Sequence, residues 1–125
     1  MEGYRCFIGD RVERCSPYRS ILDAGILVGG GSDFSVTAMD PLRSAMICLQ
    51  HPVESERISL YEALELFTVN AAKIGFLEDR KGMLKVGMDA DVAIFDANPF
   101  AAPVPDIADI KVMKTISRGE IVYER

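Results

Sequence analysis

The sequence predicts an α/β fold whose last third is rich in β-strands. Residues 26–28 (Ile-Leu-Val) form an unbroken apolar run between glycines, which is typical of a parallel strand covered on both faces. Segments with helix-capping signals lie on both sides of that run. Beyond Gly75 the apolar spacing changes from 3.6 toward 2. We therefore expect a boundary near residue 80, with one unit at 1–80 and a second at 81–125.

Two helices are expected around the apolar run. Ser16 can act as the N-cap of the first helix, Pro17 suits its first position, and Gly25 can take a left-handed conformation at its end. This helix has about two turns. Asp40, which precedes another proline, repeats the same start signal, and the second helix should end at His51, which also precedes a proline.

A third and longer helix is expected over residues 60–74. Ser59 and Glu62 have the spacing of a capping box, in which each side chain bonds the backbone of the other residue. Apolar residues then recur at helical spacing up to Gly75: Leu60, Ala63, Leu64, Phe67, Ala71 and Ile74.

The C-terminal part has the turn and strand signals that are typical of β-structure. Residues 82–87 are a turn region bounded by glycines, and residues 92–95 (Val-Ala-Ile-Phe) are typical of a strand. Residues 111–117 and 120–123 are expected to pair as a hairpin across a turn at Arg118-Gly119.

Composition limits the class of protein. The chain has 125 residues, of which 49% are apolar and 26% charged, so it suits one ordinary globular domain and neither a disordered nor a fibrous protein. Its apolar runs fall far short of the roughly 20 residues of a membrane span, and its start lacks a signal peptide. We therefore expect a cytoplasmic protein that does not bind membranes. A net charge of -5 with scattered basic residues argues against nucleic-acid binding.

Cysteine and histidine counts limit the metal chemistry. Cys6, Cys15 and Cys48 are odd in number and lack CxxC spacing, so we expect reduced thiols and no structural zinc site. Cys48 is expected to be buried, and His51 is expected at the surface near a helix end. Because catalytic metal sites commonly use two or three histidines, a chain with a single histidine cannot complete one by itself.

The candidate site follows the predicted strand, where three glycines lead to Ser32 and Asp33. This is the carboxyl edge at which α/β folds bind ligands. A phosphate-binding loop does not fit because Gly31 stands where its lysine is needed, and a nucleophile elbow does not fit because Phe34 stands where a glycine is needed. Asp33 could bind a divalent metal and accept a proton from metal-bound water. The alternative is that Ser32 and Asp33 only cap the next turn.

Several blocks of sequence, in this order and spacing, resemble the C-terminal third of a metal-dependent amidohydrolase of the branch called amidohydrolase family 3. Chance agreement of six separate blocks is improbable. The blocks are Arg11 with 17–25, then 31–33, 40–42, 59–64 with 68–72, 81–92 and 119–123.

The resemblance implies a fold and a function. The fold would be the C-terminal part of a (β/α)8 TIM-type barrel, followed by strands of a small β-sandwich that begin in block 82–91 and carry no chemistry. Asp33 would end the eighth barrel strand and serve as the catalytic residue, which is both metal ligand and proton shuttle. The complete enzyme would use a divalent metal such as zinc to hydrolyse non-peptide carbon-nitrogen bonds of small molecules.

Other parts of the family pattern are missing from this sequence, namely a His-x-His pair, a bridging Lys or Glu, and further histidines. A complete barrel takes about 250 residues. We therefore expect a segment of a larger enzyme that binds no metal alone and is inactive alone. The alternative is a non-catalytic remnant module that associates with itself or a partner through exposed sheet edges, and in either case we expect a homo-oligomer.

Overall fold

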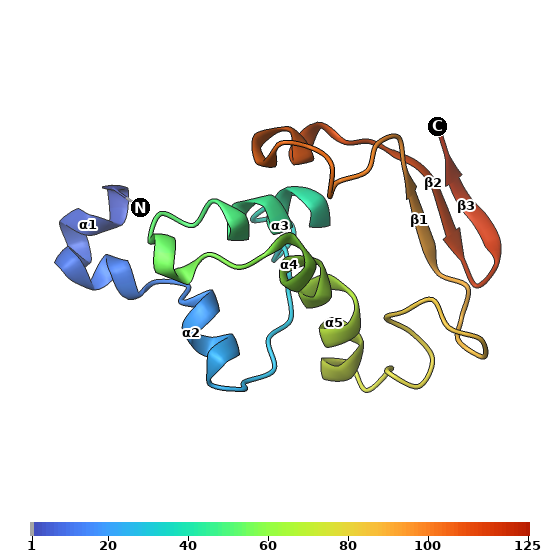
Figure 1. Cartoon of the computed structure of the whole chain (residues 1–125), viewed down its shortest axis with the longest axis horizontal. Helices are drawn as coiled ribbons and strands as arrows, with labels where there is room; N and C mark the ends of the chain where they lie inside the picture. The colour runs from blue at the N-terminus through green and yellow to red at the C-terminus, as the bar shows by residue number, and fades with distance from the viewer. Residues whose placement is uncertain (1) are drawn as a thin grey trace.

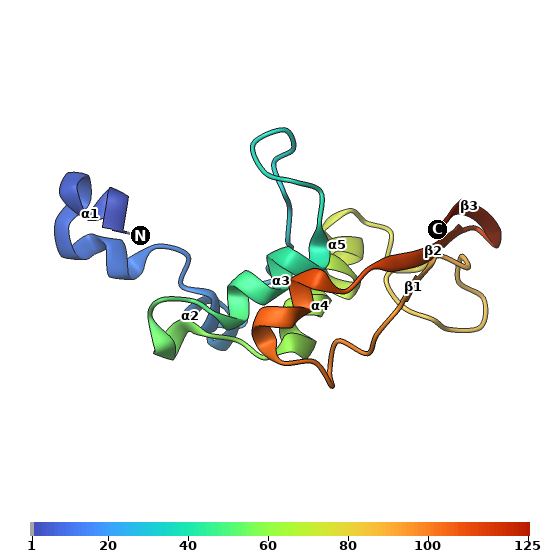
Figure 2. The ribbon, with the colours of Figure 1, turned by 90° about the horizontal axis from the view of Figure 1, so that it is seen from above.

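A computed structural model describes residues 2–125 (Figure 1). Helices occupy one side of the molecule and a three-stranded sheet lies at the other end, an arrangement that Figure 2 repeats from a second direction. No helix within the described residues is long and apolar enough to cross a membrane. The elements are α1 (Glu2–Ile8), η1 (Gly9–Arg14), α2 (Tyr18–Asp23), α3 (Pro41–Leu49), η2 (Glu54–Glu56), α4 (Leu60–Phe67), α5 (Val69–Ile74), β1 (Val92–Phe95), η3 (Val104–Asp109), β2 (Val112–Ser117) and β3 (Glu120–Glu124).

The core lies between α3 and α4. Ala45 of α3 and Ala63 of α4 are both fully buried, and these small side chains allow close packing of the two helices. Cys48, Ile58 and Leu66 complete the buried cluster. The predicted burial of Cys48 is therefore confirmed.

The residues that flank α2 and α3 explain where these two helices begin and end. The Asp40 carboxylate accepts the Arg43 backbone N–H at 3.0 Å, so α3 begins as predicted. The earlier helix, α2, begins at Tyr18 with Pro17 in the capping position, so Ser16 is not the cap that was expected. The left-handed Gly25 after α2 is confirmed, with φ +71°.

The helix expected over 60–74 is in fact two helices. The Ser59 capping box is present as predicted, but the helical path breaks at Thr68, whose φ is -122° and ψ -94°. The Thr68 hydroxyl donates to the Leu64 carbonyl at 2.9 Å, a local bond that competes with the helical pattern. Gly82 packs at the break, where an added Cβ would lie 2.8 Å from the Cβ of Ala72. The break at Thr68 therefore coincides with one local side-chain bond and with packing against a loop distant in sequence.

The strand expected at residues 26–28 is absent, and this prediction is wrong. The segment is irregular, and Ile26 and Leu27 are 57% and 47% exposed. A strand needs a neighbour to pair its backbone, and within residues 2–125 no strand runs beside this segment. The expected mixture of helix and strand is confirmed, but the only sheet in the described residues is antiparallel.

The antiparallel sheet has the order β1-β2-β3, and the predicted strand at 92–95 and the predicted hairpin are confirmed. Arg118 and Gly119 both have positive φ, +51° and +85°, as tight hairpin turns require. Asp91 connects this turn to the preceding loop, because its carboxylate accepts the Arg118 N–H at 2.8 Å and pairs with Lys81. Hydrogen bonds from the Lys81 ammonium and the Arg118 backbone N–H lower the pKa of the Asp91 carboxyl, with Lys81 as the main cause.

Candidate functional site

Asp33 lies in the loop formed by residues 31–40, which stands away from the helices (Figure 2). Its backbone is left-handed, with φ +48°, and its carbonyl accepts the Val36 N–H at 2.7 Å. The Thr37 hydroxyl donates to the Ser32 carbonyl and also closes the loop. Backbone groups and Thr37 therefore close this turn. The exposed Asp33 carboxylate has no hydrogen bond or ion pair with another residue of the described chain.

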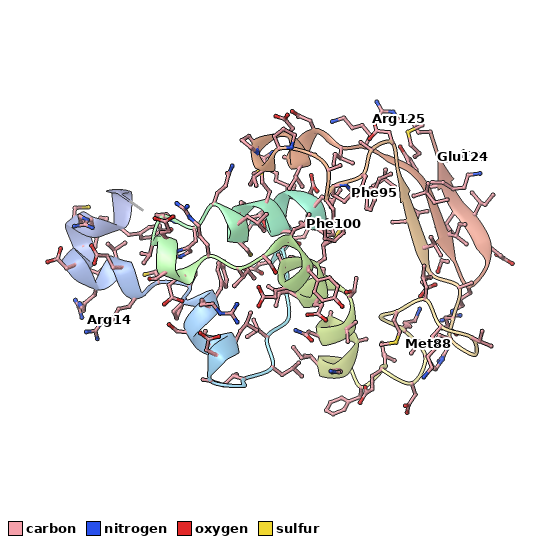
Figure 3. The ribbon with its side chains drawn as sticks, viewed as in Figure 1. Arg14, Met88, Phe95, Phe100, Glu124 and Arg125 are labelled. Carbon is pink, nitrogen blue, oxygen red and sulfur yellow. The ribbon has the colours of Figure 1, made fainter. Side chains whose placement is uncertain are left out.

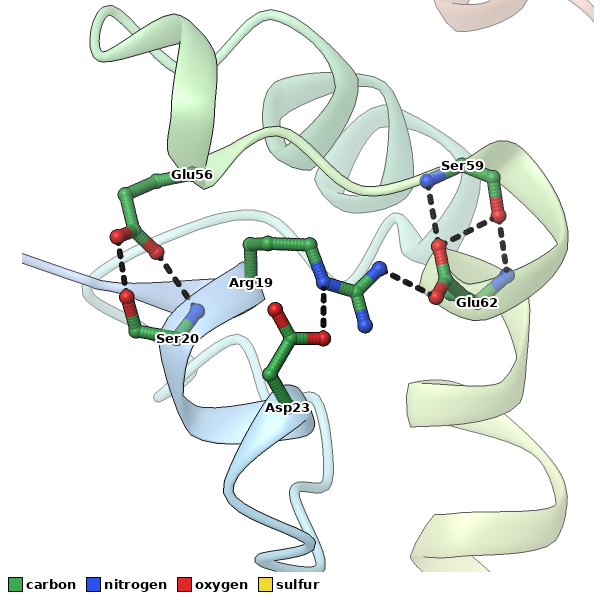
Figure 4. Close-up of polar contacts among 6 residues, drawn as sticks. All are labelled: Arg19, Ser20, Asp23, Glu56, Ser59 and Glu62. Atoms are coloured by element: carbon green, nitrogen blue, oxygen red, sulfur yellow. Dashed lines mark hydrogen bonds and ion pairs between the residues drawn. The ribbon is translucent and has the colours of Figure 1, made fainter.

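The helix before this loop is fixed by a charged network that Figure 4 shows. The Arg19 guanidinium contacts the Asp23 carboxylate at 2.8 Å and the Glu62 carboxylate at 2.6 Å. Glu62 also accepts the Ser59 backbone N–H at 2.8 Å. These contacts, chiefly the hydrogen bond from Arg19, lower the pKa of Glu62 to about 2. The network attaches α2 to the first turn of α4.

Two further contacts hold the segment that leads to Asp33. The Glu56 carboxylate accepts the hydroxyl and the backbone N–H of Ser20, which lowers the pKa of Glu56 (Figure 4). The Gly30 N–H donates to the Leu66 carbonyl at 2.8 Å. Gly30 also lies directly against Phe67, where a Cβ would be 2.4 Å from the ring. A side chain at position 30 would therefore require the Phe67 ring to shift.

A hollow of about 230 Å³ lies at the base of the loop. Met39, Pro41 and Phe67 give it a largely apolar lining, and Ser32 forms part of its wall. Asp40 also borders the hollow, but its carboxylate is already used to cap α3. The hollow therefore suits an apolar group, and Asp33 directly follows Ser32 of its wall without lining it.

His51 is buried, with 3% exposure, so the prediction of a surface position is wrong. Its Nδ1 accepts the Val53 N–H at 3.1 Å, and its Nε2 lies 3.2 Å from the Cys15 carbonyl. The Tyr18 ring packs edge-on against it, with centroids 5.6 Å apart. Tertiary contacts cause this burial, because the turn after α3 places the imidazole ring against Tyr18 of α2. Since both ring nitrogens are engaged, His51 is a packed structural residue.

A complete metal site does not fit the residues at hand. Among the side chains of residues 3–125, no three His, Cys, Asp or Glu are grouped so that they could hold a metal ion. Burial raises the pKa of the Cys48 thiol and disfavours its thiolate, so Cys48 does not suit the role of a ligand or nucleophile. Of the two carboxylates in loop 31–40, Asp40 caps α3 and Asp33 has no hydrogen-bond or ion-pair partner within the described residues.

The Arg19–Glu62 contact is a feature that sequence reasoning missed. Arg19 and Asp23 have the i,i+4 spacing of a helical ion pair, which gives a local signal for half of the network. Glu62 was expected only as part of a capping box. The contact between them spans 43 positions of sequence and depends on the packing of α2 against α4.

The amidohydrolase family model matches residues 7–123. YtcJ of Bacillus subtilis (strain 168), a protein assigned to the amidohydrolases, is 32% identical over 126 residues, which cover 93% of this chain and 24% of that protein. Imidazolonepropionase of Kosmotoga olearia (strain ATCC BAA-1733 / DSM 21960 / TBF 19.5.1) is 30% identical over 114 residues, which cover 89% of this chain and 27% of that protein.

Among solved structures, an amidohydrolase from Thermotoga maritima MSB8 is similar in fold, with a TM-score of 0.65 and 28% identity. The match covers 86% of this chain and 26% of that one. The chain thus spans about a quarter of the length of these relatives. Because the family model matches nearly the whole sequence, the chain belongs to the amidohydrolase family.

Proposed function

We propose that this chain supplies Asp33 to the divalent-metal centre of an amidohydrolase that hydrolyses a non-peptide carbon-nitrogen bond of a small molecule. One observation carries the proposal. The Asp33 carboxylate is exposed on a turn that backbone groups and Thr37 close without it. The nearby Asp40 carboxylate, in contrast, is used to cap a helix. A loop that needs no carboxylate for its own structure supports a ligand role for the one at position 33.

The other metal ligands would lie on polypeptide outside these residues. The described chain offers no cluster of three ligands, and its single histidine is engaged by backbone groups. A bound zinc or other divalent ion would supply Lewis-acid chemistry and lower the pKa of a coordinated water. The part of that chemistry belonging to this chain is one carboxylate oxygen of Asp33, held by the Gly30 and α2 contacts. The chain alone is therefore proposed to be inactive.

The apolar hollow supports a role in substrate binding. Met39, Pro41 and Phe67 would accept an apolar substituent of the substrate. The polar reacting bond would extend beyond the Ser32 wall of the hollow toward Asp33. Residues 81–125 are proposed to form a structural unit without chemistry, since Asp91, for example, is used to hold the hairpin turn. The free thiols at positions 6, 15 and 48 support a location in the reducing cytoplasm.

The test is a hydrolase assay of the full gene product that carries this sequence, with a panel of small amides and lactams. Asp33→Asn should lower kcat by about 10³-fold, since it removes both a ligand and a proton-accepting group. Asp79→Asn is the matched control because Asp79 is also an exposed turn carboxylate. Equal activity of the Asp33 and Asp79 variants would refute the role of Asp33.

A further inference from the structure

The hollow at the base of loop 31–40 is formed by this chain's own residues. Its wall comes from the two ends of the loop, the first turn of α3 and the end of α4: Ser32, Met39, Pro41, Ser44 and Phe67. The contacts that build it are also internal, since the Gly30 N–H is bonded to the Leu66 carbonyl and Asp40 caps α3. The chain therefore supplies a wall for a ligand without help from another polypeptide.

The volume of the hollow limits what it can hold. Pockets for whole drug-sized ligands measure about 300–1,000 Å³. A hollow of about 230 Å³ suits one group of a larger molecule instead. An apolar cavity of about 150 Å³ is already large enough for benzene. The size therefore matches a single aromatic ring with its point of attachment.

The lining favours an aromatic ring over water or a charged group. Ordered water needs several polar partners, and the largely apolar wall offers few. A charged group would lose its hydration without gaining a partner, because the Asp40 carboxylate at the border already accepts the Arg43 N–H. Phe67 and Met39 suit an aromatic ring, since ring–ring and sulfur–ring contacts add to the burial of apolar surface.

We infer that this hollow binds one phenyl-sized aromatic ring, and that the ring is a substituent of the substrate. The second part rests on the proposed function and narrows the substrate class to amides that carry such a ring. Ser32 belongs to the wall and Asp33 is the next residue, so a short linker would join the ring to the bond that is cleaved.

The test is the binding of fluorobenzene to the full gene product, measured by fluorine NMR. The parent protein should bind it, and Ser44→Leu should weaken binding at least about tenfold because the larger side chain fills part of the hollow. Ser55→Leu is the matched control, since Ser55 is exposed in η2 and does not line the hollow. It should leave binding unchanged. Failure of the parent to bind fluorobenzene would overturn the inference, and so would equal binding by a folded Ser44→Leu variant.

Met39→Glu provides a second substitution in case Ser44→Leu disturbs folding, which circular dichroism would detect. Met39 is 71% exposed, so the fold should tolerate a carboxylate there, and binding should again weaken at least about tenfold. Met88→Glu is its control, because Met88 lies in the loop before β1, away from α3 (Figure 3). Equal fluorobenzene affinity of these two variants would overturn the inference.

Hydrolysis tests whether the ring belongs to the substrate. The ratio of kcat/KM for phenylacetamide to kcat/KM for acetamide should fall at least about tenfold in Ser44→Leu, and an unchanged ratio would overturn this part of the inference. Asp33→Asn should lower hydrolysis but bind fluorobenzene as the parent does, since Asp33 does not line the hollow. A failure of the ring site and a failure of the Asp33 role are therefore separate results.

Discussion

The Arg19 guanidinium and the Glu62 carboxylate meet at 2.6 Å and join α2 to the first turn of α4. Each partner also has a local contact, Arg19 with Asp23 and Glu62 with Ser59. Because α2 leads directly into segment 26–33, this network helps to determine where the candidate loop begins.

Replacing Glu62 tests how much the Arg19–Glu62 network contributes to the free energy of unfolding. Glu62→Gln should lower the free energy of unfolding by about 1 kcal/mol at pH 7, the size of a lost cap and a half-exposed ion pair. Folding lowers the pKa of Glu62 from 4.5 to about 2. Its contribution is therefore complete above pH 4.5 and is lost as the pH falls toward 2. Urea unfolding at pH 7 and pH 3 measures the difference between variant and parent.

The difference should be smaller at pH 3 than at pH 7. Glu78→Gln changes an exposed carboxylate outside the network and serves as the control. A Glu62→Gln effect of equal size at both pH values would show that the charge on Glu62 does not stabilise the fold.

Gly30 and Gly31 form a matched pair for testing how closely the segment before Asp33 packs against Phe67 of α4. A Cβ at Gly30 would lie 2.4 Å from the Phe67 ring, whereas a Cβ at Gly31 meets nothing within 4 Å. Gly30→Ala should therefore destabilise the chain by about 1–3 kcal/mol through overpacking. Gly31→Ala should change stability by less than about 0.5 kcal/mol. Equal effects in thermal unfolding would contradict the close approach of the segment to α4.

The three thiols should differ in reactivity. Cys6 and Cys15 are exposed, whereas Cys48 is buried and its thiol pKa is raised mainly by that burial. At pH 8, titration with an aromatic disulfide reagent should quickly modify Cys6 and Cys15, and Cys48 should react only after unfolding. Peptide mass analysis identifies the modified positions. Rapid modification of Cys48 in the folded chain would contradict its place in the core.

Local signals in the sequence predicted the elements that local interactions determine. The Asp40 cap, the Ser59 capping box and the Arg118-Gly119 turn each act over a few residues, and all three are present. Elements that depend on distant partners were harder to predict. Residues 26–28 have the composition of a strand but lack a neighbouring strand, and the break at Thr68 coincides with packing against a loop further along the chain.

The candidate site also contains features that the sequence predicts and features that depend on tertiary packing. Asp33 could be selected from the glycines before it and from the family resemblance, because both are properties of the sequence. The burial of His51 could not be predicted, since its partners Cys15 and Tyr18 are more than 30 positions away. The Arg19–Glu62 contact depends on the same packing of α2. Contacts between distant segments, which fix the positions of the helices and accompany the break at Thr68, limited what the sequence could predict.

The central claim is that Asp33 is a metal ligand, and metal affinity tests it most directly. The full gene product is titrated with Zn²⁺ in competition with a chromogenic chelator, next to its Asp33→Asn and Asp79→Asn variants. Asp33→Asn should weaken zinc binding by at least about tenfold, whereas Asp79→Asn should leave it unchanged. Unchanged zinc affinity in a folded Asp33→Asn protein would contradict the account.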